Sequence, residues 1–212
     1  MEVWLVRHAE NLAAAEGRFG DGGLSPRGRE QARRLGEALG GRSLRACFCS
    51  PLRRARETAE IALQGRSVEI RIWPELAEGS VGDLEGLSYR EGIARHPKDF
   101  RLGRSLVPRL AASGRTAPGG ESRDAFVARA VRAAERIREQ LASAPSGLAW
   151  VVSHGGILNY LLQQLLDRPV QDRVPFGFDH CGVVRVISYR ESPAFGPAPM
   201  LRFAPLGEPV DT

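Results

Sequence analysis

Short apolar runs alternate along the chain with longer segments in which apolar residues recur every three or four positions. A short apolar run predicts a buried β-strand, and the longer spacing predicts a helix with one buried face. The predicted strands cover residues 3–6, 44–49, 68–72, 149–152, 182–189 and 200–203. The predicted helices start at Ser25-Pro26, Ser50-Pro51, about Ser122 and about Ile157, and end near residues 39, 62, 142 and 166.

This alternation of strands and helices predicts an α/β fold. The expected architecture is a three-layer α/β/α sandwich with a mainly parallel central sheet. The chain shows no internal repeat and no linker, so we expect residues 1–212 to form a single domain. Residues 79–120 are rich in Gly, Pro and Arg, and we expect a lid or insertion of loops with one or two short helices. The tail, residues 204–212, is expected to be flexible.

Polar residues follow three of the predicted strands directly. In a parallel sheet, functional groups gather just beyond the carboxyl ends of the strands. We therefore expect these side chains to converge at one edge of the sheet, although a lone histidine at a strand end is often only structural. They are Arg7-His8, Ser50 with Arg53 and Arg54, and Ser153-His154.

Imidazoles and guanidinium groups together suit phosphoryl transfer. Arginine binds a tetrahedral dianion with two parallel hydrogen bonds, and a neutral imidazole is a competent nucleophile. Nearby positive charge lowers the pKa of such an imidazole and stabilises the charge on the transferring group. A carboxyl group must then protonate the leaving oxygen. The candidates that follow the third strand are Glu75, Glu78, Asp83 and Glu85.

Composition excludes several other classes of protein. With 42% hydrophobic and 26% charged residues, the chain is typical of soluble globular proteins. No apolar run is long enough to span a membrane and no secretory leader is evident, so we expect a cytoplasmic protein with no membrane partner. The net charge of +5 is carried by basic residues interleaved with acids, Lys98 being the only lysine. Because zinc-finger spacing and RNA-binding aromatic signatures are absent, no nucleic-acid partner is expected.

The cysteines indicate neither a disulfide framework nor a metal centre. They number three, and Cys47 and Cys49 lie within a predicted buried strand. Cys181 follows His180, but no second pair has metal-ligand spacing. We therefore expect no metal and no cofactor.

Six segments, in order, resemble the motifs of the histidine phosphatase superfamily, which has the phosphoglycerate-mutase-like fold. The first, LVRHAEN, is similar to the family's R-H-G-E-T signature. The others are GLSPRGREQARRLGEAL, CSPLRRARETAE, LAEGSVGDLEGLS, PGGES and VVSHGG, and together they extend from residue 3 to about residue 165. One short motif would be weak support, but six in family order are specific.

The resemblance implies catalytic roles for five residues. His8 matches the nucleophile, which becomes a phosphohistidine. Arg7 and Arg54 match the arginines that clamp phosphate, and Glu78 matches the proton donor. His154 matches the second histidine, which helps bind the transferring phosphoryl group.

The same resemblance separates these residues from their neighbours. The Gly155 amide is expected close to the phosphoryl group. Arg53 falls on a variable position and is expected to be solvated. Glu75, Asp83 and Glu85 become non-catalytic.

The chain departs from the family pattern around the first motif. Ala9 replaces a glycine, and Asn11 replaces Thr or Ser, although its amide can still donate a hydrogen bond to phosphate. Ala14 replaces an asparagine, so one phosphate contact is expected to be lost. The following loop is shorter than in the mutases, and we assign its Phe19 and Gly20 to the substrate site.

The expected activity is that of a metal-independent phosphomonoesterase acting on a small phosphorylated metabolite of the sugar-phosphate or α-ribazole-phosphate type. The moderate length of residues 87–118 favours a phosphatase over the alternative, a cofactor-dependent phosphoglycerate mutase. A non-catalytic module that binds a phosphorylated ligand is a further alternative, and a homodimer stays open. One or two arginines of this segment are also candidates for binding a second anionic group of the substrate.

Overall fold

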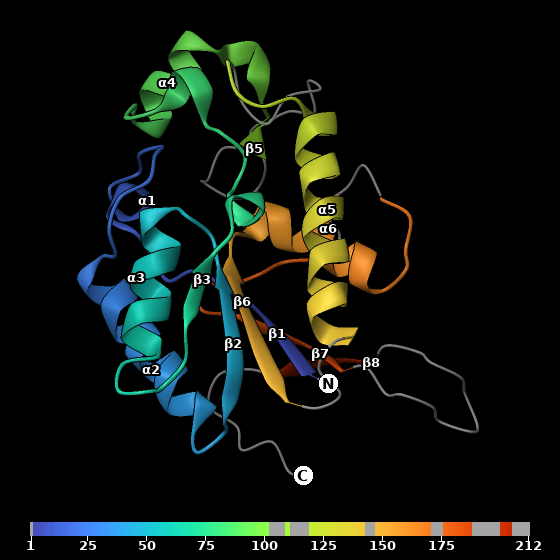
Figure 1. Ribbon diagram of the computed structural model, residues 1–212. Helices are drawn as coiled ribbons and strands as arrows, with labels where there is room; N and C mark the ends of the chain where they lie inside the picture. The colour runs from blue at the N-terminus through green and yellow to red at the C-terminus, as the bar shows by residue number, and fades with distance from the viewer. Residues whose placement is uncertain are drawn as a thin grey trace.

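In the computed structural model of the protein, a six-stranded sheet forms the central layer (Figure 1). The structure describes residues 2–101, 109–110, 119–142, 147–170, 176–187 and 200–204. Four strands run parallel, and β7 runs antiparallel to its neighbours β1 and β8, so the predicted mainly parallel sheet is confirmed. Across the sheet the order is β3 (Ile70–Ile72), β2 (Leu44–Cys49), β6 (Leu148–Ser153), β1 (Glu2–Arg7), β7 (Val183–Ile187), β8 (Met200–Ala204).

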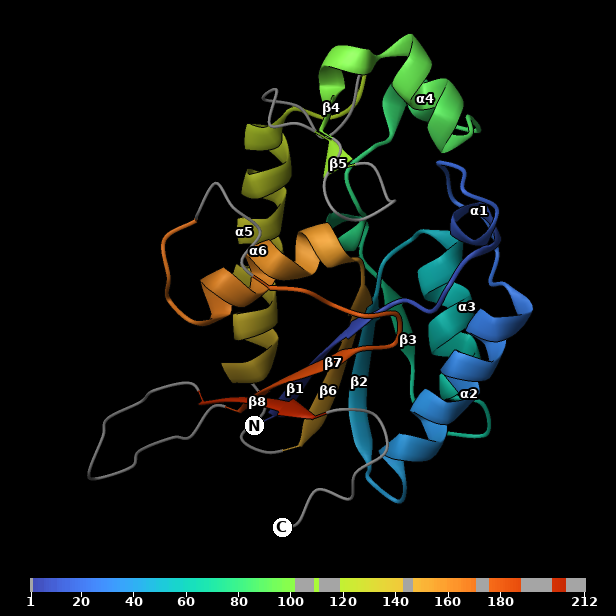
Figure 2. The same ribbon diagram turned by 180° about the vertical axis from the view of Figure 1, so that it is seen from behind.

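Helices cover both faces of this sheet (Figures 1 and 2). On one face lie α2 (Pro26–Leu39) and α3 (Arg53–Ala62), and on the other α5 (Arg123–Ala142) and α6 (Gly155–Leu165). Successive side chains of a strand point to opposite faces. Thus Val3 and Leu5 of β1 belong to the core beneath α5 and α6, while Trp4 and Val6 belong to the core beneath α2 and α3. The predicted three-layer sandwich is confirmed.

Smaller elements lie beyond the carboxyl edge of the parallel strands (Figure 1). Within the described part of residues 79–120, loops carry short helices, of which one or two were predicted, and also two short strands that were not predicted. A small apolar cluster around the buried Leu84, which includes Phe19, supports this region. The elements are α1 (Leu12–Ala15), η1 (Pro74–Leu76), η2 (Gly82–Leu84), α4 (Tyr89–Arg95), η3 (Pro97–Asp99), β4 (Phe100–Arg101) and β5 (Arg109–Leu110).

Some predicted boundaries are wrong. The helix expected at Ser50-Pro51 begins at Arg53, because the Ser50 hydroxyl accepts the Leu52 N–H and holds the chain extended before the helix. The strand expected from Val68 begins at Ile70, since the Val68 N–H bonds to a carbonyl two residues back. Residue 204, expected in the tail, ends β8. Residues 188–189 and 205–212 lie outside the described residues.

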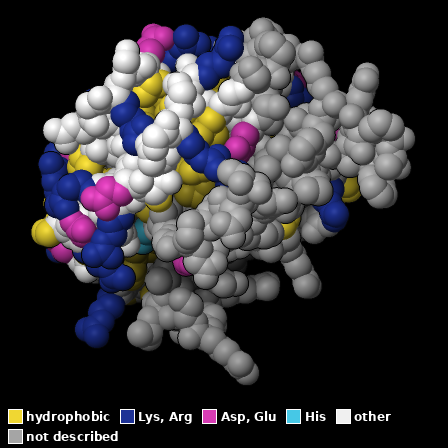
Figure 3. All heavy atoms as spheres, turned by 90° about the horizontal axis from the view of Figure 1, so that it is seen from below, with side chains coloured by type: hydrophobic (Ala, Val, Ile, Leu, Met, Phe, Trp, Pro, Cys, Tyr) yellow, Lys and Arg dark blue, Asp and Glu magenta, His cyan; other side chains and the backbone are white. Residues whose placement is uncertain are grey.

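The surface mixes charges of both signs. Figure 3 shows acidic side chains between the basic ones on the described part of one face. This agrees with the interleaving of arginines and carboxylates along the sequence. No helix in the described ranges combines the length and apolarity needed to cross a lipid bilayer.

Candidate active site

His8 occupies the first position after β1, at the carboxyl edge of the sheet. Its N–H donates to the Ser153 carbonyl of the neighbouring strand (2.8 Å), and its side chain is buried. The ring Nδ1 lies 2.7 Å from the Ala9 carbonyl oxygen. A carbonyl only accepts hydrogen bonds, so Nδ1 carries the proton and Nε2 presents its lone pair. The Arg54 Nε donates to that Nε2 at 3.2 Å.

Burial and positive neighbours keep the His8 ring neutral. Desolvation lowers the pKa of His8 well below its usual value, and the Arg54 and Arg7 guanidinium groups lower it further. His154, whose ring centroid lies 4.9 Å from that of His8, has its pKa lowered by the same causes in the same order, burial first and Arg54 next. At pH 7 both rings are therefore uncharged, which is the form that a nucleophilic imidazole needs.

Arg54 projects from the first turn of α3 and is fixed by Asp21. Its Nη1 donates to the Asp21 carboxylate at 2.9 Å. The same carboxylate accepts the backbone N–H of Arg53 (2.7 Å) at the start of α3, where the Leu52 side chain supplies no cap. Asp21 therefore both caps the helix and orients the guanidinium. The sequence interpretation missed it, since no motif links a glycine-rich loop to a helix thirty positions later.

Arg53 is solvated, as predicted. Its side chain is 68% exposed and pairs with Glu57 one turn along the helix (2.7 Å). Adjacent arginines on a helix point in different directions, so only Arg54 reaches His8.

Arg7 is the last residue of β1 and directly precedes His8. Its Nη1 donates to the Phe178 carbonyl (2.5 Å), and its Nη2 lies 3.2 Å from the Nε2 of His180. Its Nε is buried and has no hydrogen-bond partner among the described residues. The His180 ring also lies 5.6 Å from the His8 ring. His180 is thus a third histidine of this cluster, which the sequence interpretation had weighed only as a metal ligand.

His154 is held by Ser50, the residue that follows β2. The Ser50 Oγ lies 2.7 Å from the His154 Nε2, while the buried His154 Nδ1 has no partner in the part of the chain that the structure describes. A buried polar atom without a partner costs about 1–3 kcal/mol. Two such atoms, the Arg7 Nε and the His154 Nδ1, belong to side chains that flank His8. A tetrahedral oxyanion is the kind of ligand that could satisfy both.

Glu78 is fixed at the amino terminus of α6. Its carboxylate accepts the Gly156 N–H at 2.9 Å and the Gly79 N–H at 3.1 Å. A Cβ on Gly156 would lie only 2.5 Å from the Glu78 Oε1, so any larger residue there would displace the Glu78 carboxylate from this position. Gly155, next to it, lies beside Arg7, since a Cβ there would be 3.8 Å from the Arg7 Nε.

Arg129 of α5 supports the loop that carries Glu78, and it too was missed. Its Nη1 donates to the carbonyls of Glu75 (2.9 Å) and Ala77 (2.6 Å). Its Nη2 and Nε bind both carboxylate oxygens of Glu121, at 2.7 and 3.1 Å. These bonds join α5 to the Glu78 loop at two points.

The short loop after β1 holds the residues assigned to the substrate site. Asn11 is buried, and its side-chain amide donates to the Gly20 carbonyl at 3.4 Å, while its Oδ1 caps α1. The Phe19 ring packs edge-on against Tyr89. Gly20 lines the pocket described next. Within the described structure, Asn11 and Phe19 thus shape this loop, and their contact with a substrate stays a prediction.

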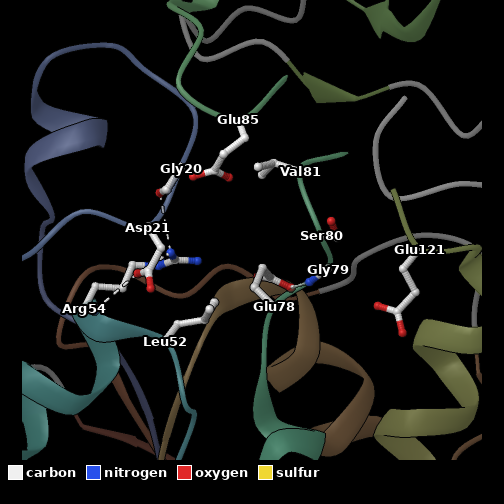
Figure 4. Close-up of a pocket in the computed structure, with 10 residues that line it drawn as sticks. All are labelled: Gly20, Asp21, Leu52, Arg54, Glu78, Gly79, Ser80, Val81, Glu85 and Glu121. Carbon is white, nitrogen blue, oxygen red and sulfur yellow. Dashed lines mark hydrogen bonds and ion pairs between the residues drawn. The ribbon is translucent and has the colours of Figure 1, made fainter. Parts of the chain in front are cut away.

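A pocket of about 520 Å³ lies at the carboxyl edge, with Arg54 and Asp21 on one side and Glu121 on the other (Figure 4). Glu78 and Glu85 line it, whereas Glu75 pairs with Arg136 outside it. His8 is not among the lining residues, but it is hydrogen-bonded to Arg54, which is. The lining residues are Gly20, Asp21, Leu52, Arg54, Glu78, Gly79, Ser80, Val81, Glu85 and Glu121.

The described residues contain no group of three His, Cys, Asp or Glu side chains arranged to hold a metal ion. Burial raises the pKa of the Cys181 thiol to about 12, so it stays protonated beside His180. A protonated thiol is a poor metal ligand.

Comparison with known proteins points to one family. The sequence model of the histidine phosphatase superfamily (branch 1) matches residues 3–195. The adenosylcobalamin/α-ribazole phosphatase of Escherichia coli K12 is 31% identical over 186 residues, which cover 84% of this chain and 86% of that protein. A metal-independent phosphoserine phosphatase of Arabidopsis thaliana is 34% identical over 162 residues, covering 74% of this chain and 65% of that protein.

Solved structures agree with the fold as well. A mycobacterial glucosyl-3-phosphoglycerate phosphatase, in its complex with VO3, superposes with a TM-score of 0.74 at 26% identity. The superposition covers 94% of this chain and 96% of that one. The resemblance to histidine phosphatases read from the six motifs is confirmed.

Proposed function

This chain belongs to the histidine phosphatase superfamily, and we propose that it is a metal-independent phosphomonoesterase that acts through a phosphohistidine on His8. The substrate is a small phosphorylated metabolite of the sugar-phosphate or α-ribazole-phosphate type, and no cofactor takes part. Phosphatases among the relatives, whose names include α-ribazole and phosphoserine phosphatases, support this class of substrate. A pocket of about 520 Å³ is of a size that suits a small metabolite.

One observation carries the proposal. The neutral His8 ring accepts a hydrogen bond from Arg54 at Nε2 and lies 4.9 Å, centroid to centroid, from the His154 ring. Among the described residues, the buried Arg7 Nε and His154 Nδ1 have no hydrogen-bond partner. A phosphoryl group on the Nε2 would place its oxygens among Arg7, Arg54 and His154. Charge that develops on those oxygens would then be stabilised by groups that are already in place.

In the first step the His8 Nε2 attacks phosphorus, and the bond between phosphorus and the ester oxygen breaks. Arg54 exchanges its bond to His8 for one to a phosphoryl oxygen. The Glu78 carboxyl group transfers its proton to the departing oxygen. The product is an alcohol, and the phosphoryl group stays on His8.

In the second step water replaces the alcohol. The Glu78 carboxylate accepts a proton from the water, whose oxygen attacks phosphorus while the bond to the His8 Nε2 breaks. Inorganic phosphate leaves, His8 is again neutral and Glu78 is again protonated. Arg129 acts on both steps only by holding the loop of Glu78.

The direct test is a panel of phosphorylated metabolites at neutral pH in EDTA, scored for both inorganic phosphate and isomerised product. We expect phosphate release that EDTA leaves unchanged and that His8→Gln abolishes. Isomerisation without phosphate release would assign a mutase instead. Turnover that needs an added metal ion, or none with any substrate, would contradict the proposal.

A further inference from the structure

We infer that His180 is a positioning residue, which holds the Arg7 guanidinium so that its Nε faces the phosphoryl group. The inference rests on the proposed function, because it gives His180 a role in binding the phosphate end of the substrate. Nothing in the motifs marks His180: it lies 26 positions beyond His154, outside the last recognised segment.

The turn that carries His180 is bonded to the end of β1. The Cys181 N–H donates to the Arg7 carbonyl (3.1 Å), and the Arg7 N–H donates to the Gly182 carbonyl (3.1 Å). Inside the turn the Gly182 N–H bonds to the Asp179 carbonyl (2.8 Å), and Cys181 adopts a left-handed φ of 57°. A non-glycine residue in that region costs free energy, so the surrounding bonds must hold it there. The backbone therefore fixes the His180 side chain relative to Arg7.

The contact between the two side chains has one consistent protonation pattern. Arginine only donates hydrogen bonds, so the His180 Nε2, 3.2 Å from the Arg7 Nη2, must be the acceptor. The proton of the neutral ring then sits on Nδ1. Burial first, and then the Arg7 charge, lower the pKa of His180 to about 4, so at neutral pH the ring is in this accepting form.

Arg7 is consequently held at two of its three nitrogens. The Phe178 carbonyl accepts from Nη1, and the His180 ring accepts from Nη2. Within the described ranges the buried Nε has no partner. Loss of the His180 acceptor would leave the plane of the guanidinium group fixed at a single nitrogen. The group could then rotate, and Nε would lose its fixed direction toward the phosphate site.

Three variants and one control test this role. His180→Leu removes the acceptor, His180→Gln places an amide oxygen near the position of Nε2, and His180→Asn carries an oxygen that falls short of it. His96→Leu is the matched control, since His96 ends α4 outside the site. For each protein we would measure kcat and KM with p-nitrophenyl phosphate, the affinity for inorganic phosphate by calorimetry, and the thermal unfolding midpoint.

We expect His180→Leu to weaken phosphate affinity and raise KM about tenfold, the loss typical of a hydrogen bond that involves a charged group. His180→Gln should recover most of this loss, and His96→Leu should equal the wild type. If His180→Leu fails to fold, the phosphate affinities of His180→Gln and His180→Asn are compared instead. His180→Asn is then expected to show the loss predicted for His180→Leu. A purely structural histidine would change the unfolding midpoint without this difference between Gln and Asn.

The inference and the proposed function fail in different ways. An active wild type whose Leu or Asn variant binds phosphate as tightly as the wild type would overturn the inference alone. So would a Gln variant as weak as the others. A wild type that binds phosphate and loses that binding in His180→Leu, yet hydrolyses no ester, would overturn the proposed function and support the inference.

Discussion

The Nε of Arg54 lies 3.2 Å from the Nε2 of His8, the nitrogen that the Ala9 carbonyl leaves unprotonated. The guanidinium group thus occupies the direction along which the imidazole lone pair points. Burial, and then the positive charge at this place, keep the ring neutral before substrate binds. The same charge is available to a phosphoryl oxygen once the ring has reacted.

Replacing Arg54 should therefore impair turnover strongly. We expect Arg54→Gln to lower kcat about 10²–10³-fold, the range found when one donor to a developing oxyanion is removed. Arg53→Gln is the matched control, because the Arg53 side chain is exposed. Among the described residues, its guanidinium group bonds only to Glu57. Steady-state kinetics with p-nitrophenyl phosphate measures both. Equal effects of the two substitutions would contradict the assignment.

The effect of replacing Glu78 should depend on how much the leaving group of the substrate needs a proton. General acid catalysis contributes typically about 10²–10⁴-fold, and an alkoxide needs the proton far more than a nitrophenolate does. We expect Glu78→Gln to lower kcat/KM steeply for a sugar phosphate and much less for p-nitrophenyl phosphate. Glu75→Gln is the control, since Glu75 pairs with Arg136 away from the pocket. A uniform loss on both substrates would argue against proton donation.

Gly156 is expected to affect turnover through the position of Glu78, although it carries no side chain. A Cβ there would meet the Glu78 Oε1 at 2.5 Å and push the carboxylate away from the amino terminus of α6. We expect Gly156→Ala to lower kcat about 10- to 100-fold, as small displacements of a catalytic group do. Gly41→Ala, with nothing within 4 Å of its Cβ, should leave activity unchanged. Full activity of Gly156→Ala would show that the position of Glu78 is not critical.

The buried histidines should make the fold sensitive to mild acid. Burial lowers the pKa of His8, His154 and His180, so below about pH 6.5 the unfolded chain binds protons that the folded chain does not. The free energy of unfolding should thus fall as the pH drops below about 7, and the contribution of His180 should level off near pH 4, the value to which its pKa is lowered.

Urea unfolding in phosphate-free buffer measures this dependence. The free energy of unfolding should fall less steeply with acidification in His180→Gln than in the wild type, whereas His96→Gln should follow the wild type. Stability that stays constant or rises over the same pH interval would show that these rings titrate normally.

The sequence predicts well where signals are local. The apolar runs locate the strands, and the polar residues after three of them identify the sheet edge at which His8, Arg54 and His154 meet. Helix periodicity locates α5 within one residue of its observed start. The resemblance then separates Arg54 from Arg53 and Glu78 from its acidic neighbours, a distinction that composition alone could not make.

What the sequence did not predict depends on contacts between distant segments. Asp21 contacts Arg54 across 33 positions, and His180 contacts Arg7 across 173. Neither pairing has a spacing rule, because each arises from how loops meet at the sheet edge. The misplaced helix and strand starts have local causes instead: the Ser50 hydroxyl accepts the Leu52 N–H, and the Val68 N–H bonds to the Arg66 carbonyl. The apolar pattern contains no signal for either bond.

The central claim is that the phosphoryl group passes through His8. The most direct measurement is rapid acid-free quenching of the enzyme with substrate in EDTA, followed by intact-mass analysis and peptide mapping. We predict a mass increase of one phosphoryl group on His8 that is stable to base, labile to acid and absent from His8→Gln. A phosphoryl group on another residue, or rapid turnover with no phosphoenzyme and an active His8→Gln, would contradict the account.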